Sequence, residues 1–524
     1  MTEFLGKVHK TNHLTTTENN KRIAKNTLML YFRMILTMLV SLYTSRVVLN
    51  TLGVEDYGTY TIVGGAVSMF GFLNGAMASA TQRFLSFDLG REDYVQLRKT
   101  FNAAQITHFG IALLVLVLAE TVGLWFVKNY LVIPDGRMDA AIWVYHFSVL
   151  ALMVTIIQTP YNAVIIARER MSVYAYISIL EVLLKLLIVF MLTWIVCDKL
   201  KLYGVLLFGV TVIVATIYRV YTRRNFDETK LEVVRDRALY KSMISFSGWN
   251  LVGGSAMVLK GQGVSIVLNM FFGTAVNAAQ GIANQVYGAI YSFVGNFQMA
   301  SNPQIIKSYA SENKDYMNSL IIRTSKFSFY LLFILTLPVI LEIDYILKLW
   351  LKLVPDYTAV FAVLALINAM IDAISGPLIT TVQATGKVKV YQVVVGTTFI
   401  LNLPLSYILL KNGFAPSSVY ALNICITALV LIQRLFFVRN LVKEFSVGKY
   451  IKLVLIKNVP VVLLAFFIPF LLTIKMESGF ARFLLVLMTS IASSIFAIYS
   501  IGLNSGEKEF VKASFVSLAS KILK

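Results

Sequence analysis

The sequence consists of long apolar runs separated by short polar segments. Each run is about 20 residues long, enough helix to cross the roughly 30 Å hydrocarbon core of a bilayer. Strand-type alternation of apolar and polar residues is absent, so helices are expected. The pattern predicts fourteen spans, at about 27–50, 59–81, 103–127, 140–166, 173–196, 203–221, 245–271, 277–302, 325–347, 357–383, 390–410, 417–438, 453–473 and 480–503.

The distribution of Lys and Arg between the loops predicts the orientation of these spans. If the N-terminus is cytoplasmic, the inner segments carry 34 basic residues and the outer ends and loops carry 10. Cytoplasmic loops of membrane proteins are enriched in Lys and Arg. Both termini are therefore expected in the cytoplasm.

Short matches within the sequence indicate an internal duplication. MASATQRFLS at 77–86 agrees with MASNPQIIKS at 299–308 in five of ten positions, at an offset of 222. The other matches, at nearly the same offset, pair VVLN at 47–50 with IVLN at 266–269, and Pro160, Ala167, Val173 and Tyr174 with Pro377, Ala384, Val390 and Tyr391. Six spans separate the copies, so the repeats are expected to be parallel, an architecture found in transporters.

The predicted fold is an all-α polytopic membrane protein with about 14 transmembrane helices. Two parallel-repeat six-helix lobes surround a central cavity, and two extra helices follow at the C-terminal end. The expected boundaries are 1–26 for a cytoplasmic N-terminal segment, 27–222 for the N-lobe, 223–244 for a cytoplasmic linker, 245–440 for the C-lobe, 453–503 for the extra helices and 504–524 for a cytoplasmic tail.

Charged and amide side chains within the spans indicate a hydrated cavity, because a charge at the bilayer centre costs a few kcal/mol. The candidate substrate-binding residues are Arg33, Arg46, Lys185, Lys260, Asn284 and Gln298. The candidate coupling residues or charge partners are Glu120, Glu181 and Asp372. Structural alternatives stay open. Glu181 and Lys185 could neutralise each other, and Arg46 could extend to the membrane–water interface. The amide side chains could form hydrogen bonds between helices. Glu120 or Asp372 could pair with a buried cation.

Composition narrows the possible functions. The net charge of +20 would suggest nucleic-acid binding in a soluble protein, but here the basic loops account for it. The two cysteines lie in separate apolar runs, the four histidines form no ligand cluster, and no G-x-x-x-x-G-K-[ST] motif is present. We therefore expect no nucleic-acid partner, no metal or cofactor, and no enzymatic activity.

The first two spans carry a recognisable motif. The stretch from KNTLMLYFRM through ASATQRFLS, together with ATGK at 384–387, resembles polysaccharide flippases of the Wzx type, in the multidrug/oligosaccharidyl-lipid/polysaccharide exporter superfamily. The pattern LG..DYG.Y, a common mark of that group, is formed by Leu52, Gly53, Asp56, Tyr57, Gly58 and Tyr60. The resemblance covers essentially the whole chain and is more specific for the family than for the substrate.

The resemblance implies a bacterial inner-membrane flippase that works by alternating access. The implied substrate is an oligosaccharide linked to undecaprenyl pyrophosphate, moved to the periplasm for surface polysaccharide or O-antigen synthesis. Membrane lipid and polysaccharide polymerase machinery are the implied partners. Arg33, Lys185 and Lys260 fit the cations that bind an anionic head group in related members. The alternatives are a multidrug or organic-cation exporter of the same superfamily and, in another class, a membrane-embedded glycan polymerase or ligase.

Overall fold

The computed structural model describes residues 16–509, except for 53–55, 57–58, 61–62, 66, 68–69, 131–132, 134–135, 195–196 and 352–353. In these residues the chain is all helical, with 89% helix and no strand. Eleven of the helices are long and apolar enough to cross a membrane. The multi-pass, all-helical prediction is therefore confirmed. The predicted spans 59–81, 245–271 and 277–302 are not among the eleven, so the count of fourteen stays a prediction.

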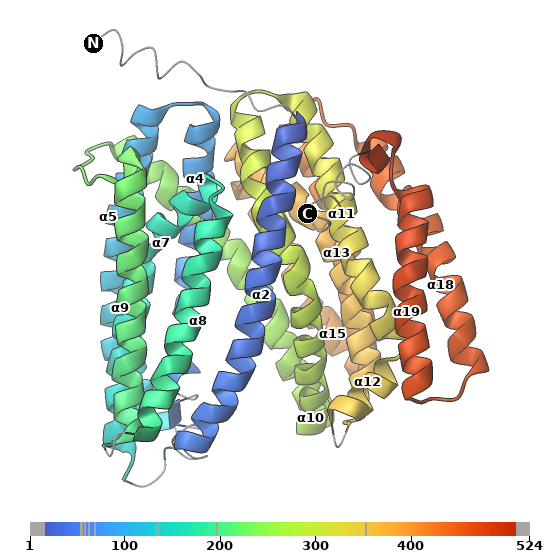
Figure 1. Ribbon diagram of the computed structural model, residues 1–524, viewed down its shortest axis with the longest axis horizontal. Coiled ribbons are helices and arrows are strands. Elements are labelled where there is room, and N and C mark those ends of the chain that lie inside the picture. The colour runs from blue at the N-terminus through green and yellow to red at the C-terminus, as the bar shows by residue number, and fades with distance from the viewer. Residues whose placement is uncertain are drawn as a thin grey trace, which may run out of the picture. The chain divides into compact units, whose positions relative to one another are not determined.

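The chain divides into two compact units, and Figure 1 shows their helices. Unit 1 holds Met1–Gly248 and Met299–Glu312, and unit 2 holds Trp249–Gln298 and Asn313–Lys524. The helices of unit 1 are α2 (Thr16–Leu52), α4 (Gly71–Gly90), α5 (Tyr94–Leu118), η1 (Ala119–Gly123), α6 (Leu124–Tyr130), α7 (Met138–Ala167), α8 (Met171–Trp194), α9 (Lys199–Asn225) and η2 (Asp227–Thr229). Its main core is built from apolar side chains of α7, α8 and α9, such as Val164, Val189 and Val214.

Unit 2 follows the same all-helical plan. Its helices after α10 (Arg237–Ala310) are α11 (Lys314–Leu341), α12 (Ile343–Trp350), α13 (Thr358–Thr385), α14 (Lys389–Ile400), α15 (Asn402–Lys411), α16 (Ser417–Leu441), α17 (Val447–Tyr450), η3 (Ile451–Ile456), α18 (Lys457–Lys475), α19 (Phe480–Ala497) and η4 (Ile498–Gly502). One core cluster joins α10, α13 and α16 around Leu268, Phe361 and Tyr420. The last two spans, α18 and α19, pack on each other and on α11.

The helical segment α10 (Arg237–Ala310) passes through both units and reverses its direction. The Ser265 hydroxyl donates a hydrogen bond to the Gln280 Oε1 at 2.6 Å. Fifteen residues of straight helix would hold these side chains about 22 Å apart. The chain therefore turns back on itself between Ser265 and Gln280, where the sequence predicts an outer turn between two spans.

Turns at matched positions of the two repeats share an unusual backbone conformation. Glu92 and Glu312, which are 220 positions apart, both have positive φ angles, of 59° and 60°. The next residues, Asp93 and Asn313, both accept a hydrogen bond from the backbone N–H three residues later and so cap the following helix. Glu169 (φ 58°) and Gly386 (φ 75°) correspond in the same way at an offset of 217. Local geometry thus repeats along with the sequence.

Buried ion pairs stabilise each unit. In unit 1 the carboxylate of Glu169 contacts Arg22 at 2.9 Å and Lys307 at 2.6 Å, which ties the start of α2 and the end of α10 to the turn between α7 and α8. In unit 2 Lys326, on α11, contacts Glu507 at 2.5 Å, and both side chains are almost inaccessible to solvent. A charge left alone in such a place is strongly destabilising, so these partners depend on each other.

The acid Asp88 lies near the end of α4, beyond the predicted span, and is buried. Burial raises the pKa of its carboxyl to about 6, although a hydrogen bond from the Thr100 hydroxyl at 2.6 Å and the nearby Arg83 act in the opposite direction. A carboxylate is poorly solvated there, so the protonated form of Asp88 persists to a higher pH than it does in water.

Candidate functional site

Arg33 anchors a polar cluster within unit 1. It lies near the middle of α2, and its guanidinium carbon is 4.8 Å from the centroid of the Tyr174 ring on α8. Stacking over an aromatic face stabilises a guanidinium without neutralising its charge. The Tyr174 ring therefore fixes the position of the Arg33 guanidinium.

One face of α8 continues this cluster. Glu181 and Lys185, one turn apart, form an ion pair at 2.6 Å, and both side chains are more than a third exposed. The hydroxyl of Tyr218 on α9 is hydrogen-bonded to Ser178 and lies within electrostatic range of Glu181 and Arg33. The i,i+4 pairing that the sequence left open is present. The cluster around Arg33 thus contains two cations and one carboxylate, contributed by α2 and α8.

Unit 2 contains a second polar cluster. The Lys260 ammonium, on α10, lies 4.5 Å from the centroid of the Phe399 ring on α14. The carboxylate of Asp372 on α13 lies within electrostatic range of Lys260 and of Arg434 on α16. This cluster also contains two cations and one carboxylate.

Neutral side chains orient these charges. Asp372 accepts hydrogen bonds from Asn368, at 2.9 Å, and from the Tyr287 hydroxyl. Tyr287 stacks on Tyr291 one turn further along α10, with 5.3 Å between ring centroids. The cluster therefore presents aromatic and amide groups beside its charges.

The two clusters use equivalent tyrosines. Tyr174 and Tyr391 are the residues paired by the repeat at an offset of 217. Tyr174 lies under the guanidinium of Arg33, whereas the hydroxyl of Tyr391 accepts a hydrogen bond from the Arg434 Nε at 3.1 Å. Each repeat thus holds an arginine at its tyrosine, but the arginine comes from the first helix of one repeat and the last helix of the other.

Arg434 is the residue of the clusters that the sequence does not reveal. It lies near the end of a predicted span, where it counts as one more inner-loop cation. In the structure its side chain is buried, 4% exposed, and directed at Tyr391. Its ring partners, Tyr391 and Phe399, are 43 and 35 residues away in sequence, so no local spacing shows these contacts. Its position within the apolar stretch of the span is the one feature of the sequence that indicates a buried arginine.

The remaining predicted residues make other contacts. Glu120, in the π-helical turn η1, contacts His146 on α7, with 3.0 Å between Oε1 and Nδ1. Gln298 is buried, and its amide donates to the Ser328 hydroxyl and the Ala373 carbonyl. Asn284 is exposed on α10. The side chain of Arg46 lies outside the described residues.

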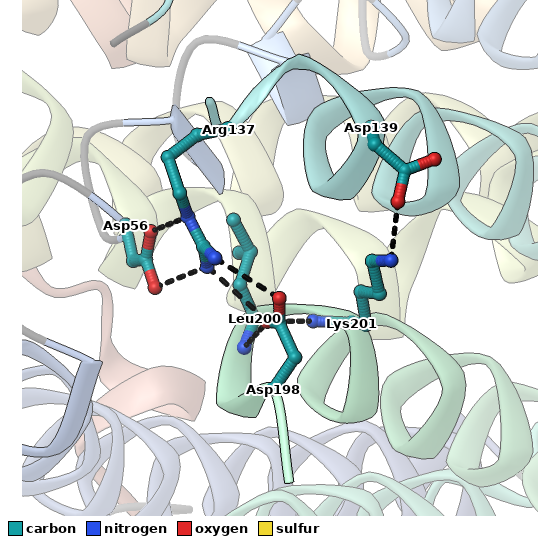
Figure 2. A network of polar contacts seen from close by, with 6 residues as sticks. All are labelled: Asp56, Arg137, Asp139, Asp198, Leu200 and Lys201. Atoms are coloured by element: carbon teal, nitrogen blue, oxygen red, sulfur yellow. Dashed lines mark hydrogen bonds and ion pairs between the residues drawn. The ribbon is translucent and has the colours of Figure 1, made fainter. Parts of the chain in front are cut away.

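A separate network joins the loops at one end of unit 1 (Figure 2). Arg137 donates two hydrogen bonds to Asp56, at 2.7 and 2.6 Å, and two to Asp198, at 2.9 and 3.2 Å. Asp198 also caps α9 by accepting from the backbone N–H groups of Leu200 and Lys201. Asp56 belongs to the LG..DYG.Y motif, so the network shows what its carboxylate does in this chain. Through Arg137 it links the chain just after α2 to the starts of α7 and α9.

The charges of this network shift one another's pKa. The hydrogen bond with Asp198, helped by Asp56, raises the pKa of Arg137 above its ordinary value. Partial burial acts to raise the pKa of Asp198, but the hydrogen bonds from Arg137 and from the backbone of α9 outweigh it and lower that pKa. Both groups are therefore ionised at neutral pH.

Among the residues that the structure describes, no group of three His, Cys, Asp or Glu side chains is placed to hold a metal ion.

Comparison with solved structures identifies the fold. An outward-facing multidrug resistance MATE family transporter of the MOP superfamily superposes with a TM-score of 0.70 at 10% identity, covering 81% of this chain and 97% of that one. A MATE transporter of Vibrio cholerae matches with a TM-score of 0.63 at 14% identity, covering 83% and 99%. The chain has the MATE transporter fold.

A third solved structure with the MATE-like fold is a MOP superfamily transporter from Pyrococcus furiosus. Its TM-score is 0.66 at 10% identity, and the match covers 80% of this chain and 95% of that one. The binding pocket of that transporter has reverse polarity, which suggests a different function for it. No family model and no curated protein matches the sequence. These structural neighbours are transporters rather than enzymes.

Proposed function

We propose that this protein is a flippase that moves an oligosaccharide linked to undecaprenyl pyrophosphate across the bacterial inner membrane by alternating access. The observation that carries the proposal is the charge of the two clusters. Arg33 and Lys185 accompany Glu181 in unit 1, and Lys260 and Arg434 accompany one acid, Asp372, in unit 2. Among the described residues, each cluster thus contains one more cationic side chain than carboxylates.

The excess of cations fits an anionic cargo. A pyrophosphate brings about two negative charges into a region where an unpaired charge is strongly destabilising. Guanidinium groups bind phosphate oxygens in bidentate geometry, and ammonium groups act as point charges. The aromatic and amide side chains near Asp372 could bind the sugar. Moving one charge across a potential of 100 mV provides about 2.3 kcal/mol, an energy source that requires no nucleotide site.

An exporter of organic cations is the rival function, because the fold is that of MATE transporters. Such a cargo would need an excess of carboxylates, which the described clusters lack. The reversed pocket polarity of the Pyrococcus furiosus neighbour gives a precedent for a transporter of this fold whose pocket departs from its relatives. The polarity of the clusters in this chain supports an anion.

Charge-removing variants test the proposal. Arg33→Gln, Lys260→Gln and Arg434→Gln should each lower transport of the lipid-linked oligosaccharide by about tenfold or more, because a charged hydrogen bond to phosphate contributes roughly 1.5–3 kcal/mol. Arg439→Gln is the matched control, since Arg439 is exposed on the same helix as Arg434. Surface polysaccharide and membrane-protein level are measured together. Normal export by the well-expressed Arg33→Gln/Lys260→Gln double variant would contradict the proposal.

A further inference from the structure

A cavity of about 660 Å³ lies on unit 1 among α5, α7, α9 and the segment 231–233 that follows η2. Its volume is within the roughly 300–1,000 Å³ of small-molecule sites. None of the charged residues of the two clusters lines it. The cavity is therefore a separate site.

The walls of this cavity change from polar to apolar along the helices. Each helix contributes a pair of lining residues seven positions apart, or about 10 Å of helix. At the end of the cavity nearest segment 231–233, the members of the three pairs are Asn102, Tyr161 and Arg219. At the deeper end they are Phe109, Val154 and Val212. A ligand that fills this space must have one polar end and one apolar end.

The polar end holds groups without protein partners. Within the described part of the chain, neither the Arg219 guanidinium nor the Gln158 amide forms a side-chain hydrogen bond or an ion pair, and Arg219 is exposed. By contrast, Arg98 on the neighbouring helix contacts Glu232 at 2.9 Å. Arg219 is thus a cation available to a ligand.

The adjoining surface is also basic. A neighbouring cavity of about 800 Å³ shares Glu232 with the first and is lined by four basic residues and three acidic ones. Two of the basic residues, Lys99 and Arg170, have no ion-pair partner among the described residues. The field at the polar end therefore favours an anion.

Segment 231–233 closes the polar end in an unusual way. Its backbone is fixed by Asn102, whose Oδ1 accepts from the Glu232 N–H at 2.8 Å and whose Nδ2 donates to the Lys230 carbonyl at 3.1 Å. The side chains of Leu231 and Val233 nevertheless remain 53% and 78% exposed beside the cavity. A ligand at this end therefore meets exposed apolar side chains as well as the Arg219 cation, which suits an amphipathic molecule.

We propose that this cavity binds one anionic phosphoglycerolipid. Its phosphate pairs with Arg219 and lies near Gln158, and an acyl chain packs against Phe109, Val154 and Val212. The rest of the lipid stays in the bilayer, which the open side of the cavity allows. Since segment 231–233 belongs to the connection between α9 and α10, the bound lipid also holds this connection against unit 1.

Two pairs of variants test the site on the full-length protein in detergent. Arg219→Gln removes the head-group cation, and its control is Arg224→Gln, an exposed arginine at the end of the same helix. Val212→Trp fills the deep end, and its control is Val117→Trp, at an exposed position of α5 outside the cavity. Val154→Phe is a second filling variant. Phosphatidylglycerol is titrated, bound lipid is counted by native mass spectrometry, and thermal unfolding without lipid checks that each variant folds.

The wild-type protein and both controls should retain one phosphatidylglycerol with similar affinity. The affinity of Arg219→Gln should fall about tenfold, as expected for a lost charge-assisted contact to phosphate, and the filling variants should lose the lipid. If all variants bind like wild type, the lipid is only annular and the proposal fails. If only the filling variants lose it, the assignment of the phosphate to Arg219 is wrong and the proposal fails as well.

Discussion

Replacing Arg137 with Gln should destabilise unit 1 more than any nearby surface change. Arg137 is the only cation that contacts both Asp56 and Asp198 in the described residues, and the three side chains are 28%, 19% and 31% exposed. Gln cannot reproduce the four hydrogen bonds, and it leaves two partly buried carboxylates facing each other. Asp198 would keep its role as the cap of α9.

The size of the effect follows from the geometry. Two bidentate carboxylate contacts would contribute about 1.5–3 kcal/mol each if they were fully buried. Their partial exposure reduces this to roughly 1 kcal/mol each. With the added repulsion between the carboxylates, we expect the free energy of unfolding to fall by about 2–3 kcal/mol. Asp139→Asn, which removes only the exposed pair with Lys201, should change it by less than about 0.5 kcal/mol.

Thermal unfolding in detergent at neutral pH measures the difference. A double-mutant cycle of Arg137→Gln with Asp56→Asn isolates the coupling between the two residues. The pKa of Asp198 is lowered in the folded protein, so the contribution of this carboxylate is present at neutral pH and is lost as the pH falls through its folded pKa. If Arg137→Gln unfolds at the same temperature as Asp139→Asn, the network has no stabilising role and this reasoning is wrong.

Three further predictions concern buried acids. Because burial raises the pKa of Asp88 to about 6, its contribution to the free energy of unfolding is largest at acid pH and decreases as the pH rises through 6. Asp88→Asn should remove this pH dependence, which amounts to at most about 3 kcal/mol. The unfolding temperature measured between pH 4 and 7 checks it. Glu169→Gln should lower the unfolding temperature by several degrees because two cations lose their partner, whereas Glu312→Gln, with the same positive φ but an exposed side chain, should not. Lys326→Met alone should be strongly destabilising, and adding Glu507→Leu should restore most of the loss; the double variant being less stable than the single would contradict this view of the pair.

The sequence predicts the fold well wherever hydrophobic runs determine the structure. The spans near 140–166 and 417–438 appear as α7 and α16, because about 20 apolar residues in lipid have few alternatives to helix. The turn within α10 falls between the predicted spans 245–271 and 277–302, which are separated by a short break containing Gly273. The docking of segment 230–233 on α5 is different, because it depends on Asn102, which lies 128 positions from Lys230 and 130 from Glu232. The sequence predicts only a cytoplasmic linker there, at 223–244.

For the candidate site, the sequence identifies the charged residues within the spans but not the side chains that contact them. Arg33 and Lys260 are visible because no acid lies three or four residues away in an apolar span. Their aromatic partners, Tyr174 and Phe399, come from other helices, and so does the pairing of Glu120 with His146. Such contacts depend on how the helices pack, and they join residues that are far apart in sequence. Local sequence spacing therefore cannot predict them.

The central claim, that the cargo is an anionic lipid-linked oligosaccharide, is tested most directly in proteoliposomes. Purified protein is reconstituted with an undecaprenyl-pyrophosphate-linked oligosaccharide, and access of the sugar to an added glycosidase is followed under a membrane potential. The account predicts rapid exchange between leaflets with the wild-type protein, a loss of about tenfold or more with Arg33→Gln/Lys260→Gln, and no uptake of an organic-cation dye. Uptake of the dye without movement of the lipid-linked sugar would contradict it.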